Sequence, residues 1–137
     1  MATKSETTRA VAEKFLDRLG AQDQDGIEEL FAPDIDWHVP GAEKLPWTGH
    51  RSRREEIAPY FTTMWAVYVD GKSKVVMERM IVEDENVMIL GTFTHTVAEN
   101  GREFTTPSAL HLVVENGEIT RLHLYEDTLA VDNAFAP

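Results

Sequence analysis

Cysteine is absent from the sequence. Without thiols the chain can form no disulfide, offers no thiolate ligand for a metal and has no cysteine nucleophile. Its stability must therefore come from the packing of its core.

Positive charge is scarce, because 13 lysines and arginines stand against 24 acidic residues and leave a formal net charge of −11. This sign repels phosphate backbones and anionic lipid surfaces. The basic cluster Arg51, Arg53 and Arg54 is followed by Glu55 and Glu56, which predicts a solvated, partly self-paired face rather than a phosphate site. We expect no nucleic-acid partner and no membrane partner.

Long hydrophobic runs are also missing. The opening stretch MATKSETTRAVAEKFLDRLG mixes charged and apolar residues and contains neither the apolar run of a signal peptide nor a membrane span. We therefore expect a cytoplasmic protein. With 137 residues, 42% hydrophobic and 27% charged, the chain is typical of one ordinary globular domain covering residues 1–137.

Apolar residues at helical spacing predict two helices at the start of the chain. Val11, Phe15 and Leu19 recur every fourth residue and predict a helix that ends at Gly20. A shorter second helix follows and ends before Pro33, which lacks an amide donor and clashes with the preceding turn.

The next segment is predicted to contain a short strand, a loop and a third helix. Residues 35–39 alternate apolar and polar side chains, as a strand does, and residues 41–51 read as a loop. Ser52 and Glu55 form a capping box that opens the third helix. We expect Pro59 to kink that helix without breaking it.

The second half of the chain has the alternation of strands. Four successive strands are predicted near residues 73–83, 87–97, 103–114 and 119–126. The Asn-Gly pairs between the later strands favour tight hairpin turns, so the sheet should be a mostly antiparallel meander. Three N-terminal helices and such a meander predict an α+β fold in which the helices pack on one face of a curved sheet, leaving a cone-shaped cavity for a small ligand.

The order of elements, together with the segments FAPDIDWHVPG, LPWTGHRSRREEI and NGEITRLHLYEDTLAVDNAF, resembles the nuclear transport factor two-like superfamily. Within it the chain looks most like the SnoaL-type branch. That branch contains polyketide cyclases, and its neighbours include limonene-epoxide hydrolases and ketosteroid isomerases. The resemblance implies an enzyme that uses the cone as its active site.

Three catalytic candidates follow from this resemblance. Asp127, in Tyr125-Glu126-Asp127, matches the place where cyclases and epoxide hydrolases carry a catalytic aspartate, and we assign it as the base. His111 matches a cyclase histidine that faces this aspartate, and we assign it as the donor. His38, in His-Val-Pro, matches an asparagine that helps to hold water in the hydrolases.

The sequence departs from two of the related enzymes. Gly91 and Phe93 stand where epoxide hydrolases carry an arginine and an aspartate. Phe15 and Val39 stand where ketosteroid isomerases carry a tyrosine and an aspartate. The machinery of the hydrolases is therefore incomplete, and isomerisation by the ketosteroid isomerase pair is disfavoured.

A carboxylate at the rim of an apolar cone loses solvation and gains a raised pKa, which suits it to take a proton. A histidine there can donate or accept, because its pKa is near physiological pH. The alternatives are that Asp127 caps a helix formed by residues 128–135, and that His111 and His38 only fill the sheet face. No metal-ligand spacing appears, so we expect neither a metal nor a cofactor.

Aromatic residues are expected to form the walls and mouth of the cone and to contact the substrate, although such rings are more often part of a core. These are Trp37, Trp47, Tyr60, Trp65, Phe93 and Tyr125. Trp47 stands out because it lies in an otherwise polar loop with no core of its own.

The sequence thus predicts a cofactor-free acid/base enzyme, a cyclase, isomerase or hydrolase, acting on an apolar carbonyl compound or epoxide. Two alternatives remain: a domain that binds a ligand without chemistry, and a dimerisation module with no cavity. Because Leu122 and Leu124 alternate with Tyr125 and Asp127, we expect them on the outer face of the sheet, where they would favour a homodimer.

Overall fold

The structure is a computed structural model that describes all 137 residues. Its helices are α1 (Lys4–Gly20), α2 (Gln24–Glu28), α3 (Ile57–Trp65), preceded by the short turn η1 (Arg54–Glu56), and α4 (Thr128–Phe135). Its strands are β1 (Phe31–Val39), β2 (Gly49–Arg53), β3 (Lys74–Glu83), β4 (Asn86–Thr96), β5 (Glu103–Glu115) and β6 (Glu118–Glu126).

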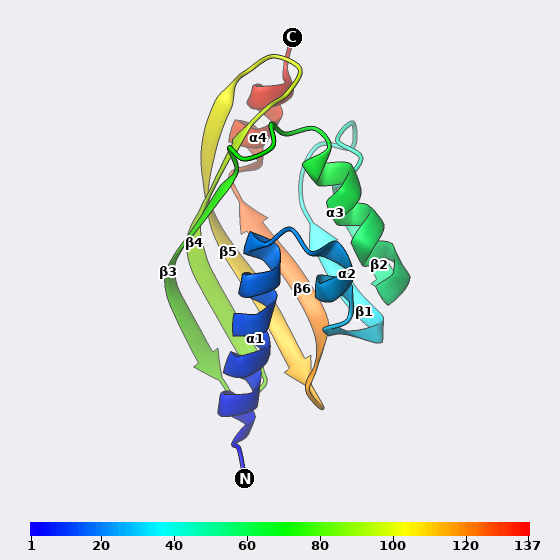
Figure 1. The fold of residues 1–137 in the computed structure, drawn as a ribbon, viewed down its shortest axis with the longest axis vertical. Coiled ribbons are helices and arrows are strands. Elements are labelled where there is room, and N and C mark those ends of the chain that lie inside the picture. Colours follow the sequence, from blue (N-terminus) through cyan, green and yellow to red (C-terminus); the bar gives the residue numbers. More distant parts are fainter.

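All strands belong to one sheet, in the order β2-β1-β6-β5-β4-β3. Each neighbouring pair is antiparallel except β1 and β6, which are parallel. The sheet is strongly curved; α1, α2 and α3 lie over its concave side and α4 lies at one end (Figure 1). The predicted α+β architecture is confirmed.

The region around α3 differs from the prediction in two respects. Residues 49–53, predicted as part of a loop, form strand β2, which carries no apolar alternation and exists because it pairs with β1. Helix α3 begins only at Ile57, so Pro59 lies in its first turn, where a missing amide costs no hydrogen bond. The capping acid is Glu56, whose Oε1 accepts from the amides of Ser52 and Arg53.

Strand β3 contains a bulge where it pairs with β4. The pairing of β3 with β4 shifts register between Met77 and Arg79. Gly91 on β4 faces this bulge, and a Cβ atom built there would overlap the carbonyl oxygen of Val76. A side chain at position 91 would therefore push the two strands apart.

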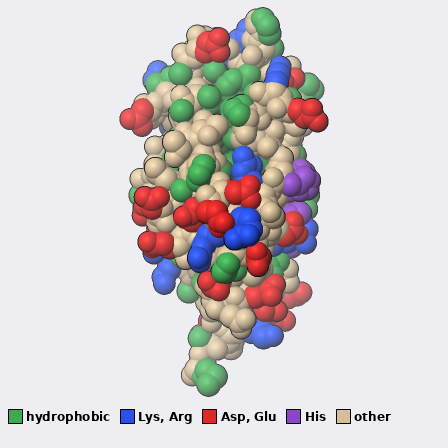
Figure 2. Space-filling view, turned by 90° about the vertical axis from the view of Figure 1, so that its right-hand side faces the viewer, with side chains coloured by type: hydrophobic (Ala, Val, Ile, Leu, Met, Phe, Trp, Pro, Cys, Tyr) green, Lys and Arg blue, Asp and Glu red, His purple; other side chains and the backbone are tan.

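The core lies between the helices and the concave face of the sheet. Phe31, Trp37 and Ile57 are almost completely buried there, and their neighbours form one continuous cluster. No helix has the length and apolar character needed to cross a bilayer. The basic side chains on the face shown in Figure 2 lie among acidic ones, and Arg53 forms ion pairs with Asp34 and Glu55.

Candidate active site

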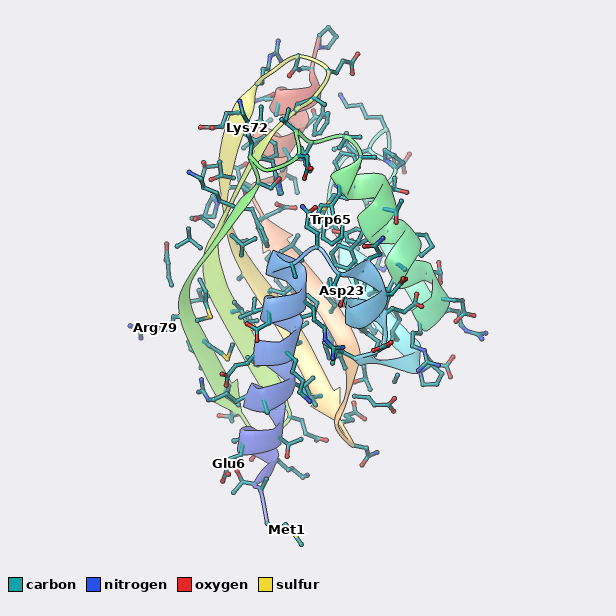
Figure 3. The ribbon with its side chains drawn as sticks, viewed as in Figure 1. Met1, Glu6, Asp23, Trp65, Lys72 and Arg79 are labelled. Atoms are coloured by element: carbon teal, nitrogen blue, oxygen red, sulfur yellow. The ribbon has the colours of Figure 1, made fainter.

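A cavity of about 290 Å³ lies between α1, α3 and the concave face of the sheet. Of the 22 residues around it, 17 are hydrophobic; the other five are Gly20, Gln22, Ser73, His95 and Glu126. Trp65 lies on the side of α3 that faces the sheet and α1 (Figure 3). Such a concave apolar space with a few polar groups is the usual form of a small-molecule site.

Glu126, the last residue of β6, is the only carboxylic acid on the cavity wall. Burial raises the pKa of its carboxyl to about 7, and the neighbouring Asp127 adds to the shift. Neither a hydrogen bond nor a cation offsets this effect. A carboxyl with this pKa exchanges protons easily near neutral pH.

Two tyrosines, Tyr60 from α3 and Tyr68 from the segment that follows it, also line the cavity. Burial raises the pKa of both phenols, and the negative charge of Glu126 raises it further. The guanidinium of Arg51, 5.0 Å from the centre of the Tyr60 ring, opposes this only in part. Both phenols therefore keep their protons; the Tyr60 hydroxyl donates to the Sδ of Met64 at 3.5 Å, and the Tyr68 hydroxyl remains a hydrogen-bond donor.

His95 of β4 is a buried, neutral histidine on the cavity wall. Burial lowers the pKa of its imidazole to about 4. Its ring is stacked on that of Tyr68, with 4.1 Å between centroids, and its Nδ1 lies 2.8 Å from the hydroxyl oxygen of Ser73. In the tautomer protonated on Nε2, the Ser73 hydroxyl donates to Nδ1 and Nε2–H is left as a donor.

Trp37 of β1 carries a buried indole N–H. Its side chain is 1% exposed and lines the cavity, yet its indole N–H has no hydrogen-bond partner. A buried donor without a partner costs free energy, and because this nitrogen exposes almost no surface it is not presented to the cavity.

The structure places five of the six aromatic residues named from the sequence around this one cavity. They are Trp37, Trp47, Tyr60, Trp65 and Phe93. Trp47 packs against Phe135 of α4 and Tyr68. It is thus a core residue, and its loop closes one end of the cavity. That these rings contact a substrate stays a prediction.

Tyr125 and Asp127 do not lie in the cavity, contrary to our prediction. Tyr125 is 53% exposed on the outer face of the sheet. Asp127 follows the end of β6 and caps α4, its Oδ1 accepting from the amide of Ala130 at 3.1 Å. Of the two interpretations of Asp127, the structure thus shows the helix cap.

The two predicted catalytic histidines also lie on the outer face. His111 sits opposite His123 in the β5–β6 pair, and its Nε2 is 2.9 Å from the amide oxygen of Asn86. His38 is stacked on His50 at 4.2 Å, on the same side of the sheet as His123. Burial lowers the pKa of both His38 and His111, with smaller effects from His50 and His123 on His38, which Asp36 opposes, and from Arg121 and His123 on His111. Neither histidine meets the cavity.

The reason for these errors is the direction of alternation in β6. Leu122 and Leu124 are opposite Leu112 and Leu110 of β5, and all four belong to the core. The two leucines therefore point into the cavity, together with Glu126, and the expectation that they cover the outer face is wrong. The homodimer prediction loses the observation on which it was based.

Glu126 and His95 are the site residues that the sequence analysis missed. The signal for Glu126 was available, because Leu122, Leu124 and Glu126 share one parity and the leucines are the more apolar set. His95 lies in a run of threonines that gives no such indication.

The fold and the cavity define the class of protein. A protein from Burkholderia pseudomallei, described as NTF2-like and of unknown function, superposes with a TM-score of 0.86 at 19% identity over 96% of this chain and 98% of that chain. TerC, co-crystallised with polyporic acid, gives 0.81 at 19% identity over 93% and 97%. A presumed isomerase from Rhodopseudomonas palustris gives 0.73 at 17% identity over 93% and 95%. At these identities the similarity shows the fold alone.

The chain belongs to the SnoaL-like domain family, which it matches over residues 12–122. This confirms the resemblance drawn from the sequence. Among curated proteins, no sequence matches the chain significantly.

Proposed function

We propose that the protein is a cofactor-free acid/base enzyme in which Glu126, rather than Asp127, is the base. The observation that carries this proposal is a single carboxyl with a pKa of about 7 on the wall of an apolar cavity. A group with this pKa is half ionised near neutral pH, so it can both take and return a proton.

The substrate we propose is a small, mostly apolar carbonyl compound. A cavity of about 290 Å³ lies at the lower end of the usual range for ligand sites, which favours a molecule of one or two rings. The aromatic walls suit a flat ligand. The solved relatives are consistent with this proposal, since one was crystallised with an organic acid and another is a presumed isomerase.

In the proposed reaction, the Glu126 carboxylate removes a proton from the carbon next to the carbonyl group. The electron pair of the broken C–H bond moves onto the carbonyl oxygen and forms an enolate. The phenol of Tyr68 and the Nε2–H of His95 are the available donors to this oxygen, and the Tyr60 phenol can join them by giving up its contact with Met64 Sδ. Protonated Glu126 then returns the proton to the same or a conjugated carbon, which gives exchange or isomerisation.

The first prediction tests this role with two-ring ketones such as 2-tetralone in D₂O, followed by proton NMR. Binding is detected by quenching of tryptophan fluorescence, and exchange of the protons next to the carbonyl is then timed. Glu126→Gln keeps the size of the side chain but cannot accept a proton, so exchange should slow by about a hundredfold to ten-thousandfold. Asp127→Asn keeps the helix cap and should exchange at the wild-type rate.

A ketone that binds but exchanges no faster than in buffer would contradict the proposal and favour a domain that binds without chemistry. Loss of exchange in Asp127→Asn with normal Glu126→Gln activity would return the role to Asp127. The third alternative, a dimerisation module without a cavity, does not fit a structure that has one.

A further inference from the structure

Strand β3 is one of the two edges of the sheet and carries several exposed apolar side chains. It pairs with β4 on one side and with no strand on the other. Val75, Val76, Met77 and Ile81 are between 43% and 53% exposed. A long edge strand with exposed apolar side chains invites pairing with another strand.

The sequence of this strand is complementary to itself when two copies run antiparallel. When the two copies are aligned about a point between Glu78 and Arg79, each apolar residue lies opposite an apolar residue and each charged residue lies opposite one of the other sign. The pairs are Lys74 with Glu83, Val75 with Val82, Val76 with Ile81, Met77 with Met80, and Glu78 with Arg79. In a two-fold dimer each of these pairs occurs twice.

Because of the bulge in β3, the two residues of each proposed pair point to the same face of the sheet. In a regular strand, partners whose residue numbers differ by an odd amount point to opposite faces. The register shift between Met77 and Arg79 displaces the alternation of side chains between the two faces by one residue. Val75 and Met77 then share the helix-covered face with Met80 and Val82, because their β4 partners Phe93, Gly91, Ile89 and Val87 lie on that side.

The charges on β3 have no partners within the monomer. The ion pairs of the chain involve other residues. Arg79 extends away from the edge of the sheet (Figure 3). The two bases and two acids of the strand cancel, so this edge is locally neutral in a chain of net charge −11. Two copies can thus approach here with less repulsion than elsewhere.

We infer that β3 pairs with β3 of a second copy of this chain, in antiparallel register and centred between Glu78 and Arg79. The two sheets then form one continuous sheet. Edge charges and bulges also serve to keep sheets apart, but the order of charges here matches a reversed copy rather than repelling it.

Substitutions that reverse the charges of Glu78 and Arg79 test this interface. The oligomeric state of the full chain is measured by sedimentation over a range of concentrations. Arg79→Glu places an acid opposite Glu78 twice, and Glu78→Arg places a base opposite Arg79 twice. Each single variant should weaken the dimer by about tenfold or more. The double variant restores both pairs and should recover wild-type association to within about threefold.

Register is tested by cysteine pairing, which the absence of native cysteine makes unambiguous. Under mild oxidation, a mixture of Val76→Cys and Ile81→Cys chains should form a cross-linked dimer, whereas either variant alone should not. Tyr125→Cys on the outer sheet face serves as the control and should stay uncross-linked. Thermal melting checks that each variant is folded.

Three results would overturn the inference. These are a wild-type chain that stays monomeric at all concentrations, a double charge variant no better than the single ones, and cross-linking through Tyr125→Cys. The last would place the second copy against the face of the sheet instead.

Discussion

Glu126 and Asp127 show how strongly position decides the chemistry of a residue. They are adjacent carboxylic acids, yet one lines an apolar cavity and the other caps a helix at the surface. Burial raises the pKa of Glu126 to about 7. A capping carboxylate accepts amide hydrogen bonds at the start of its helix.

The second prediction concerns the pH dependence of the proposed exchange reaction. The base is the ionised form of Glu126, so kcat/KM should rise with pH and reach half of its maximum at about pH 7, the pKa of this carboxyl. The measurement is the exchange rate of 2-tetralone between about pH 5 and pH 9, with buffer rates subtracted. A profile that is flat over this range, or that falls as pH rises, would count against Glu126 as the base.

At the scale of elements, β3 and β4 approach each other closely beside the cavity. The bulge in β3 brings the Val76 carbonyl against Gly91, a position that tolerates no side chain. The same two strands carry Val75 and Phe93 on the cavity wall. Gly91, the position that the resemblance aligned with the arginine of epoxide hydrolases, is therefore a glycine for a structural reason.

The third prediction is that Gly91→Ala destabilises the fold by at least about 1 kcal/mol, because the new methyl group forces β3 away from β4. Gly20→Ala is the matched control, since nothing lies within 4 Å of the added Cβ. Denaturant unfolding of both variants is the measurement. Equal stability of the two would show that the bulge yields without cost.

At the scale of the whole molecule, two buried groups push the stability in opposite directions as pH changes. The folded-state pKa of Glu126 is raised from 4.5 to about 7. Its contribution to folding stability is therefore full below about pH 4.5 and is lost as pH rises through 7. The folded-state pKa of His95 is lowered from 6.5 to about 4, so its contribution is full above 6.5 and is lost as pH falls toward 4.

The fourth prediction follows from this opposition. Glu126→Gln should be more stable than the wild type by about 2 to 3 kcal/mol at about pH 8, and similar to it at about pH 4. The lower value applies if solvent in the cavity relieves part of the free energy that it costs to bury the charged Glu126 carboxylate. Unfolding free energies of both proteins at the two pH values are the measurement. A variant no more stable than the wild type at the higher pH would mean that Glu126 is well solvated.

Much of the architecture could be predicted from local sequence. The spacing of Val11, Phe15 and Leu19 gives α1, and the Asn116-Gly117 pair, both with positive φ, gives the β5–β6 hairpin. Strand β2 could not be predicted in this way. Its side chains are polar and mostly exposed, and only hydrogen bonding to β1 makes it a strand.

The sequence by itself determined the α+β fold, the order of its elements and most of the aromatic wall, because periodicity and turn chemistry are local properties. The apolar character of Leu122 and Leu124 indicated which face of β6 looks inward, but the tertiary structure was needed to decide it against the resemblance. Pairing with Leu110 and Leu112 of β5 turns Leu122, Leu124 and Glu126 into the cavity, and a shift of one position sends the neighbouring residues to the other side. The candidate base is therefore one residue away from the aspartate that the resemblance indicated.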